Sequence, residues 1–515
     1  MIGILLDETL SAYEQDIREL LMAFFPGEPF CYEKKPEAGL FVCGKKEQIS
    51  LLRKPAEQVA VRPLFLTESR KDNKTQVKRA LYALLSELTG EMLPWGTLTG
   101  IRPVKLAEQR KQEGASDEET KAELQRKYLV SEEKAALSVE IAERERQILS
   151  RIDYRKGLSL YIGIPFCPST CLYCSFTSYP IAAWEQRLGE YLDCLREELR
   201  QFERLRNRPL QTIYIGGGTP TALPADRLRQ LLSIVEETLD LSALSEYTVE
   251  AGRPDSLTGE KLQALREFQV ERISVNPQTM NQKTLDLIGR RHTVEDVKAA
   301  FCKAREAGFQ NINMDLIMGL PEETEEDVGH TLSEIEALHP DSLTVHALAV
   351  KRAARLNTSG NAWAHLARAG KEEASRMTEL GALAAERMGL RPYYLYRQKN
   401  MAGNQENVGY AAPGKENLYN ILMMEEKHTV IGCGAGASSK LILEQTETKG
   451  TCQGAGDSRQ QGKHTEAPEP SQENAGAKGS YRVERFENIK NIAEYLPRFS
   501  ELLEKKEAFL RNLPQ

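Results

Sequence analysis

The chain has 515 residues, of which 41% are hydrophobic and 28% are charged, and its net charge is -7. This length predicts two or three domains of roughly 150 residues each. The composition is that of an ordinary globular protein and excludes a disordered or fibrous chain. The negative net charge gives no overall attraction to phosphate backbones, so we expect no nucleic-acid partner.

The first residues do not have the features of a secretory signal peptide. Residues 1–15 lack a basic segment and include Asp7 and Glu8. No uncharged apolar run approaches the roughly 18 residues that a membrane span needs. The chain has nine cysteines, an odd number. Together with the lack of a predicted export signal, this argues against a disulfide framework. We therefore expect a cytoplasmic protein without a membrane span.

Residues 1–153 are predicted to form an N-terminal α+β domain of unknown role. Short apolar runs, such as 2–6 and 40–43, accompany helical stretches such as 77–88. The segment 95–103 has the glycine and proline residues of a structured turn, for which packing is a simpler explanation than ligand binding.

Residues 154–350 are predicted to form an α/β domain, a partial (β/α)6 barrel of the TIM type. Short β-rich runs alternate with amphipathic helical segments, and parallel neighbouring strands require such crossovers. In this architecture functional groups gather at the carboxyl ends of the strands. The six runs are residues 158–164, 212–215, 247–250, 272–275, 311–318 and 342–346.

Residues 351–515 are predicted to form a mostly helical C-terminal region that covers the substrate. Helical spacing continues over 378–387, and a polar, aromatic stretch follows over 393–419. Residues 444–480 contain no large apolar side chain and are predicted to be a disordered insertion. A final helix is expected over 489–510.

Three cysteines, Cys167, Cys171 and Cys174, form a C-x3-C-x2-C motif directly after the first run of the barrel. Three thiolates on one loop can face a common point. A structural zinc site usually has four ligands, and no fourth Cys or His follows closely. Three thiolates on a four-iron cluster would leave one iron open for a non-protein ligand. Zinc and unliganded buried thiols remain the alternatives.

Three separated motifs resemble oxygen-independent coproporphyrinogen III oxidase and its relatives, a family of radical S-adenosylmethionine (SAM) enzymes. They are Tyr161-Ile-Gly163-Ile-Pro-Phe-Cys167 with the cysteines that follow, Gly216-Gly-Gly-Thr-Pro-Thr221, and Asn313-Met-Asp315-Leu-Ile-Met-Gly319-Leu-Pro321. The resemblance spans about residues 158–348. The extended N-terminal region and the segment 397–410 are most similar to the HemZ type.

The resemblance implies that the three cysteines bind a [4Fe-4S] cluster whose open iron takes SAM. Glycines 217 and 218 would let backbone groups approach its methionine moiety, and Glu250 would face its cationic groups. Arg290 would clamp the methionine carboxylate, Asp315 would bind the ribose, and Ala347 would contact the adenine. No catalytic side chain is assigned. The positions implied to contact SAM are Tyr161, Tyr173, Gly217, Gly218, Thr219, Glu250, Gln278, Arg290, Asp315 and Ala347.

The resemblance also implies a reaction and its partners. A reduced donor such as flavodoxin or ferredoxin would supply the electron that cleaves SAM, and the 5'-deoxyadenosyl radical would remove hydrogen from a propionate β-carbon of coproporphyrinogen III. Loss of carbon dioxide and one electron would leave a vinyl group, and two rounds would give protoporphyrinogen IX in haem biosynthesis. By charge, the candidate partners of the propionates are Lys351, Arg352, Arg355, Arg397 and Lys399.

Two positions depart from the pattern of the oxidases. The sequence has Phe176 where they carry a fourth cysteine, and Gly163 where they carry a histidine. The pattern Cys174-Ser175-Phe176 is closer to relatives that bind or deliver haem, so a haem chaperone built on the same barrel is the alternative function. Those relatives carry a histidine in an Asn-rich motif, and the comparable residues 417–420 contain none.

Overall fold

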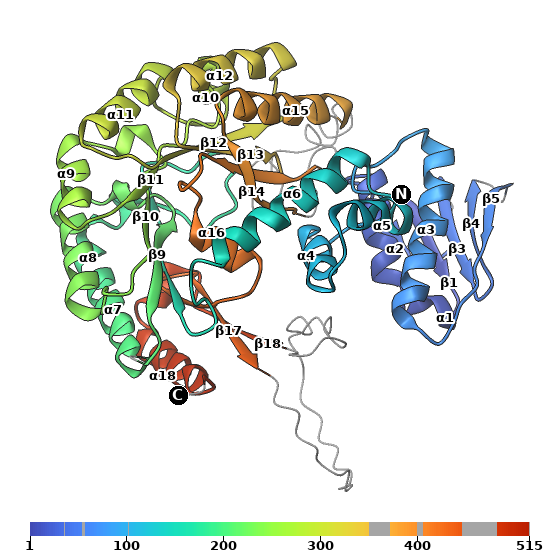
Figure 1. Cartoon of the computed structure of the whole chain (residues 1–515), viewed down its shortest axis with the longest axis horizontal. Helices are drawn as coiled ribbons and strands as arrows, with labels where there is room; N and C mark the ends of the chain where they lie inside the picture. The colour runs from blue at the N-terminus through green and yellow to red at the C-terminus, as the bar shows by residue number, and fades with distance from the viewer. Residues whose placement is uncertain are drawn as a thin grey trace, which may run out of the picture.

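A five-stranded sheet and an eleven-stranded sheet organise the computed structural model of the protein (Figure 1). The structure describes residues 1–35, 37–53, 57–100, 102–205, 207–349, 371–398, 405–444 and 481–513.

The N-terminal sheet has its own hydrophobic core. Apolar side chains of its strands, such as Ile4 and Val42, pack against Leu20 and Leu81 from two helices. This unit lies at one side of the larger sheet in Figure 1. Its strands follow the order β2-β1-β3-β4-β5. The elements are β1 (Ile2–Leu6), α1 (Glu8–Ser11), α2 (Glu14–Phe24), β2 (Phe30–Cys31), β3 (Leu40–Lys45), β4 (Gln48–Arg53), β5 (Glu57–Pro63) and α3 (Arg70–Thr89).

Three helices lead from this sheet to the barrel: α4 (Val104–Gln112), α5 (Asp117–Tyr128) and α6 (Glu132–Leu149). Ser116 caps the N-terminus of α5 and forms a capping box with Glu119. Buried side chains of all three helices belong to the main hydrophobic core and not to the core of the N-terminal sheet.

The central strands run parallel in chain order and confirm the predicted α/β fold with a partial TIM-like barrel. Helices separate successive strands and lie along the outside of the curved sheet (Figure 1). The strands are β6 (Leu158–Ile164), β9 (Leu210–Gly217), β10 (Glu246–Glu250), β11 (Arg272–Ser274), β12 (Ile312–Met318) and β13 (Ser342–Ala347). The helices are α7 (Leu188–Arg200), α8 (Ala225–Thr238), α9 (Gly259–Glu267), α10 (Gln282–Leu287), α11 (Val294–Glu306) and α12 (Glu325–Leu338).

The C-terminal region is less helical than the sequence predicted, because five of its segments are strands of the large sheet. One of these strands pairs parallel with β6, and another pairs antiparallel with β13, so the region extends the barrel sheet at both edges. Residues 445–480 of the predicted insertion lie outside the described residues. The elements are α15 (Lys371–Arg387), β14 (Arg391–Tyr396), β15 (Asn407–Ala411), α16 (Leu418–Met424), β16 (Thr429–Cys433), β17 (Ser438–Glu444), β18 (Tyr481–Glu487), α17 (Ile492–Tyr495) and α18 (Phe499–Leu510).

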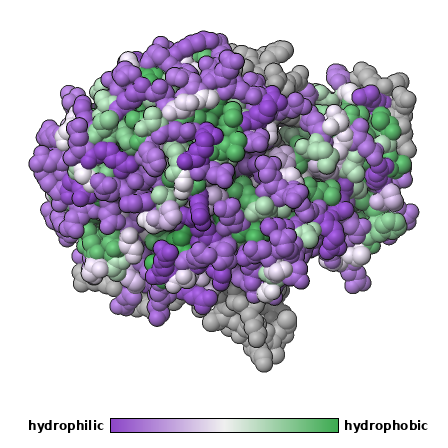
Figure 2. Space-filling view, turned by 45° about the horizontal axis from the view of Figure 1, so that its top comes forward, coloured by the Kyte–Doolittle hydropathy of each residue, from purple (hydrophilic) through white to green (hydrophobic). Residues whose placement is uncertain are grey.

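The face of the molecule in Figure 2 is mostly hydrophilic, and hydrophobic groups are scattered among the polar ones. Such scattered groups are ordinary on protein surfaces. Within the described ranges no helix combines the length and the apolar character that are needed to cross a bilayer.

Candidate active site

The three motif cysteines lie on one loop beyond β6. Cys167 ends the short strand β7 (Phe166–Cys167), and the chain then turns so that the Cys174 amide donates to the Cys171 carbonyl at 3.2 Å. None of the three is in a disulfide. Burial raises the pKa of Cys167 to about 11. The nearby Cys171 and Cys174 thiols add to this effect, and the hydrogen bond with Thr219 opposes it.

The donor set of this loop suits an iron-sulfur cluster. Cluster ligation requires thiolates, and three cysteines on one loop leave one iron free of a protein ligand. Binding of a metal would release the protons that burial otherwise keeps on the thiols. Across the described part of the chain, no three His, Cys, Asp or Glu side chains form a preformed site for a single metal ion.

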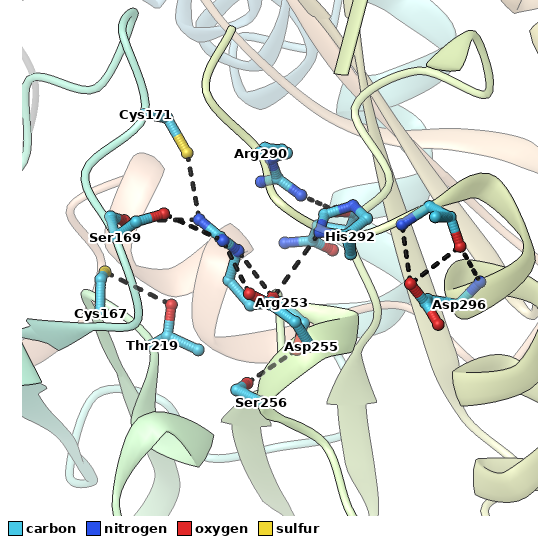
Figure 3. A network of polar contacts seen from close by, with 12 residues as sticks. Cys167, Ser169, Cys171, Thr219, Arg253, Asp255, Ser256, Arg290, His292 and Asp296 are labelled. Carbon is cyan, nitrogen blue, oxygen red and sulfur yellow. Dashed lines mark hydrogen bonds and ion pairs between the residues drawn. The ribbon is translucent and has the colours of Figure 1, made fainter. Parts of the chain in front are cut away.

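The glycine motif after β9 lies directly against the cysteine loop. The Gly218 amide donates to the Ile164 carbonyl at 2.8 Å, and the Thr219 amide donates to the Phe166 carbonyl at 2.7 Å. A Cβ atom on Gly218 would lie 2.6 Å from the Phe166 carbonyl oxygen, so this approach requires glycine. The Thr219 hydroxyl lies 3.4 Å from the Cys167 sulfur (Figure 3). Residues 217–219 and the cysteines therefore form one site.

A stack of three tyrosines connects β6, β9 and α16. Tyr161 on β6 and Tyr214 on β9 are paired in register, and their rings stack with centroids 6.1 Å apart. Tyr419 from α16 stacks on Tyr214 at 4.7 Å. Tyr161 was predicted as a site residue from the sequence, whereas Tyr214 and Tyr419 were not. The alternation of side chains along neighbouring strands could have indicated Tyr214.

Glu250, at the end of β10, is connected to this stack. The Tyr214 hydroxyl donates to Glu250 Oε1 at 2.6 Å. Burial raises the pKa of Glu250 to about 7, and the nearby Asp315 carboxylate adds to the effect, although hydrogen bonds from Tyr214 and Gly217 oppose it. A cationic ligand group beside Glu250 would favour its ionised form.

Gln278 and Arg290 both follow β11 in the sequence. Arg290 is buried and donates to the Asn276 carbonyl and, at 3.2 Å, to the Tyr173 hydroxyl. Gln278 has a φ of 70°, and its amide donates to the Asp315 carbonyl at 3.0 Å. The side-chain oxygens of Asn276 and Gln278 are buried and accept no hydrogen bond from the described residues. Buried amides of this kind are usually satisfied, so a bound ligand is a reasonable partner for them.

Asp315 and Ala347 are on neighbouring strands. Asp315 accepts a hydrogen bond from Asn313 at 2.7 Å and lies 3.8 Å from His346 Nε2. Burial alone would raise the pKa of Asp315, but these two neighbours and Thr344 lower it below its usual value. The Ala347 amide donates to Asn407 Oδ1 at 3.0 Å, so this amide is already engaged.

Of the five predicted substrate cations, Arg397 is the one that lies among the described residues. Arg397 is buried, donates to the Leu98 carbonyl at 2.6 Å and lies over the Trp95 ring. These contacts place it against the N-terminal region, and its role as a propionate partner stays a prediction. Burial accordingly lowers the pKa of Arg397 to about 10. The other four candidates, Lys351, Arg352, Arg355 and Lys399, lie outside the described residues.

One arginine near the cysteines, Arg253, was not predicted from the sequence. Arg253 lies just beyond β10, and its guanidinium donates to the Cys171 sulfur at 3.4 Å (Figure 3). The sequence gives no signal for this contact, because the two residues are 82 positions apart.

Comparisons with known proteins agree with this geometry. The family model of the Radical SAM superfamily matches residues 161–335. The oxygen-independent coproporphyrinogen-III oxidase-like protein HemZ of Bacillus subtilis (strain 168) is 44% identical over 384 residues, which cover 74% of this chain and 76% of that protein. The heme chaperone HemW of the same organism is 35% identical and is matched over 54% of this chain and 70% of its own.

Among solved structures, coproporphyrinogen III oxidase (HemN) from Escherichia coli, described as a radical SAM enzyme, aligns with a TM-score of 0.49 at 20% identity, covering 69% of this chain and 72% of that one. The family model and the extent of the match to HemZ decide the assignment. The chain belongs to the radical SAM family, among the coproporphyrinogen-III oxidase-like proteins of the HemN/HemZ type.

Proposed function

We propose that this chain is a radical SAM enzyme that decarboxylates the propionates of coproporphyrinogen III. The observation that carries the proposal is the contact between the cysteine loop and the glycine motif, which brings the Cys167 thiol beside residues 217–219. Membership in the radical SAM family implies a [4Fe-4S] cluster and SAM, and the three cysteines would hold the cluster.

The surrounding residues have the chemistry that SAM requires. Residues 217–219 would offer backbone groups to its methionine part, and Arg290 would pair with its carboxylate. Glu250 would face its positive charge, and Asp315 would accept from the ribose hydroxyls. Gln278, whose side-chain oxygen is buried and accepts no hydrogen bond from the described residues, would accept from a ligand donor. Tyr161 and Tyr173 would bound the space and limit the access of water.

The names of the relatives support a tetrapyrrole as substrate. Bound SAM, cleaved by one electron from the cluster, would supply a 5'-deoxyadenosyl radical. Each propionate would then lose a hydrogen atom from its β-carbon, carbon dioxide and one further electron, leaving a vinyl group. A donor such as flavodoxin or ferredoxin would deliver the first electron, and a one-electron acceptor would take the last one.

The test is an anaerobic incubation of the reconstituted protein with SAM, a reductant and coproporphyrinogen III. We expect 5'-deoxyadenosine together with vinyl porphyrin. Cys167→Ser should abolish both products and lower the bound iron. Cys302→Ser, which changes an exposed cysteine on α11, should leave both unchanged. If the wild-type protein binds no iron, the proposal is wrong. If 5'-deoxyadenosine forms without porphyrin turnover, only the proposed substrate is wrong.

A haem chaperone is the second candidate, because the relative that is 35% identical carries that name. Phe176, at the position of the fourth cysteine of the oxidases, is 68% exposed and provides no ligand to the cluster loop. Against this candidate, residues 417–420, which are comparable to the histidine-containing Asn-rich motif of the haem-binding relatives, contain no histidine. Haem titration distinguishes the two functions: stoichiometric haem binding without vinyl product would favour the chaperone.

A further inference from the structure

Arg253 joins the cysteine loop to the end of β10. Its side chain is buried, with 3% of its surface exposed. One terminal nitrogen donates to the Cys171 sulfur and to the Ser169 carbonyl, both at 3.4 Å, and the other donates to the Ser169 hydroxyl at 3.2 Å. Figure 3 shows this guanidinium between the loop and Asp255. Arg253 therefore contacts one of the three proposed cluster ligands directly.

Asp255 holds the opposite edge of the same guanidinium. Arg253 Nε and Nη2 donate to the two Asp255 oxygens, each at 2.9 Å. His292 Nδ1 lies 3.6 Å from Asp255 Oδ1, on the side away from the cysteines. Burial alone would raise the pKa of Asp255, but His292 and Arg253 lower it well below its usual value. Asp255 is therefore an anionic anchor for the arginine.

The backbone around Arg253 is fixed from two further elements. The Ser256 hydroxyl donates to the Arg253 carbonyl at 2.7 Å and lies 2.8 Å from the Thr221 hydroxyl of the glycine motif. Lys261 donates to the carbonyls of Thr221 and Ser256 at 2.6 and 2.9 Å. The backbone that carries Arg253 is thus tied to the glycine motif and to α9.

The two edges of the Arg253 guanidinium contact chemically different groups. One edge is neutralised by a carboxylate in a bidentate pair, and the other edge donates to the sulfur of a cysteine. Hydrogen bonds to ligand sulfurs and nearby charge are known to set the reduction potential of iron-sulfur clusters. A positive group beside the sulfur stabilises the reduced state, because reduction adds negative charge to the cluster.

We propose that Arg253, oriented by Asp255, is a positioning residue that fixes Cys171 as a ligand and makes the bound cluster easier to reduce. The proposal rests on the proposed function, because it requires the cluster at the three cysteines. If Arg253 only anchored the loop through Ser169, its replacement would leave the reduction potential of the bound cluster unchanged.

The experiment measures bound iron and the midpoint potential of the reconstituted full-length protein by a redox titration followed by electron paramagnetic resonance. In Arg253→Gln we expect the ratio of reduced to oxidised cluster at a fixed potential to fall about tenfold, equivalent to about 59 mV toward more negative potential. Arg253→Lys keeps the charge but not the fork, and should shift the potential less. Asp255→Asn removes the compensating anion and should shift it in the opposite direction.

The controls separate the possible failures. Arg229→Gln changes an arginine on the outer helix α8 that also pairs with carboxylates, and should leave the potential unchanged. Ser169→Ala removes a loop contact of Arg253 but keeps the Cys171 contact, and should also leave it unchanged. An unchanged potential in Arg253→Gln at full iron content overturns the inference, as do shifts of equal sign in Arg253→Gln and Asp255→Asn. If Arg253→Gln loses its iron, its potential cannot be measured, and Asp255→Asn becomes the test. A shift of its potential to more positive values supports the inference, and a shift to more negative values overturns it. Absence of iron from the wild-type protein instead refutes the proposed function.

Discussion

Trp95 Nε1 donates a hydrogen bond to Glu406 Oε2 at 2.7 Å and so joins two residues that are 311 positions apart. Lys134 donates to the other Glu406 oxygen at 2.6 Å. Glu406 directly precedes β15, and the next residue, Asn407, accepts the hydrogen bond of the Ala347 amide. The N-terminal region therefore holds the start of β15, which pairs with β13 beside the proposed SAM site.

Replacement of Trp95 by phenylalanine should destabilise the protein. The change keeps an aromatic ring but removes the donor to Glu406, which is 1% exposed. A buried charged acceptor that loses a partner costs about 1–3 kcal/mol. Urea denaturation should show this loss in the free energy of unfolding. The matched change Trp184→Phe, on a partly exposed tryptophan, should cost less. Equal costs for the two variants would contradict the importance of the Glu406 contact.

Glu250→Gln should change how stability depends on pH. Burial raises the pKa of Glu250 to about 7 in the folded protein, from 4.5 for an ordinary glutamate. Between these values the folded state holds a proton that the unfolded state has released, so wild-type stability falls as the pH rises. The glutamine is neutral throughout. From pH 4.5 to pH 7 the metal-free wild-type protein should therefore lose about 3 kcal/mol relative to the variant. Parallel pH profiles would show that Glu250 has an ordinary pKa.

The strands of the barrel could be predicted because their signals are local. Gly157 and Pro165 bound the apolar run of β6, and the observed strand, Leu158–Ile164, is the one that was predicted. The strand β16 has a similarly short apolar run but was missed. Only its pairing with β6, far away in the sequence, identifies it as a strand of the barrel sheet. Pairing between strands that are distant in the sequence produces no local pattern from which such a strand could be predicted.

The residues of the candidate site also differ in whether a local sequence pattern identifies them. Cys167, Cys171 and Cys174 are recognisable because their spacing is local. Arg253 is separated from them by two strands of the sheet, and in the sequence it resembles any surface arginine. Arg397 was singled out by its charge alone, and no pattern in the sequence indicates its burial against Trp95 and the Leu98 carbonyl.

Lys506→Met should destabilise the docking of the C-terminal helix α18. Lys506 is fully buried and donates to Glu198 Oε1 at 2.6 Å, and Glu198 is fully buried as well. Removal of one partner leaves a buried charge uncompensated, which costs about 3–5 kcal/mol. The measurement is the free energy of unfolding in urea. The neighbouring change Lys505→Met affects a side chain that is 63% exposed, and it should stay within about 0.5 kcal/mol of wild type. Similar effects of both changes would exclude the buried pair as the cause.

Gly218→Ala should disturb both stability and retention of the cluster. Its new Cβ would lie 2.6 Å from the Phe166 carbonyl oxygen and 2.9 Å from the Ile164 carbonyl oxygen, and backbone atoms cannot yield as flexible side chains can. Crowding of this kind costs about 1–3 kcal/mol.

The shift caused by Gly218→Ala should move the glycine motif away from Phe166, the residue directly before Cys167, and so lower the iron retained after anaerobic reconstitution and gel filtration. Gly259→Ala is the control, because no atom outside its own helix and its chain neighbours lies within 4 Å of the added Cβ, and α9 begins at this position. It should leave both the iron content and the free energy of unfolding at the wild-type level. If Gly218→Ala also keeps its iron and stability, the two loops are not packed as closely as the 2.6 Å approach requires.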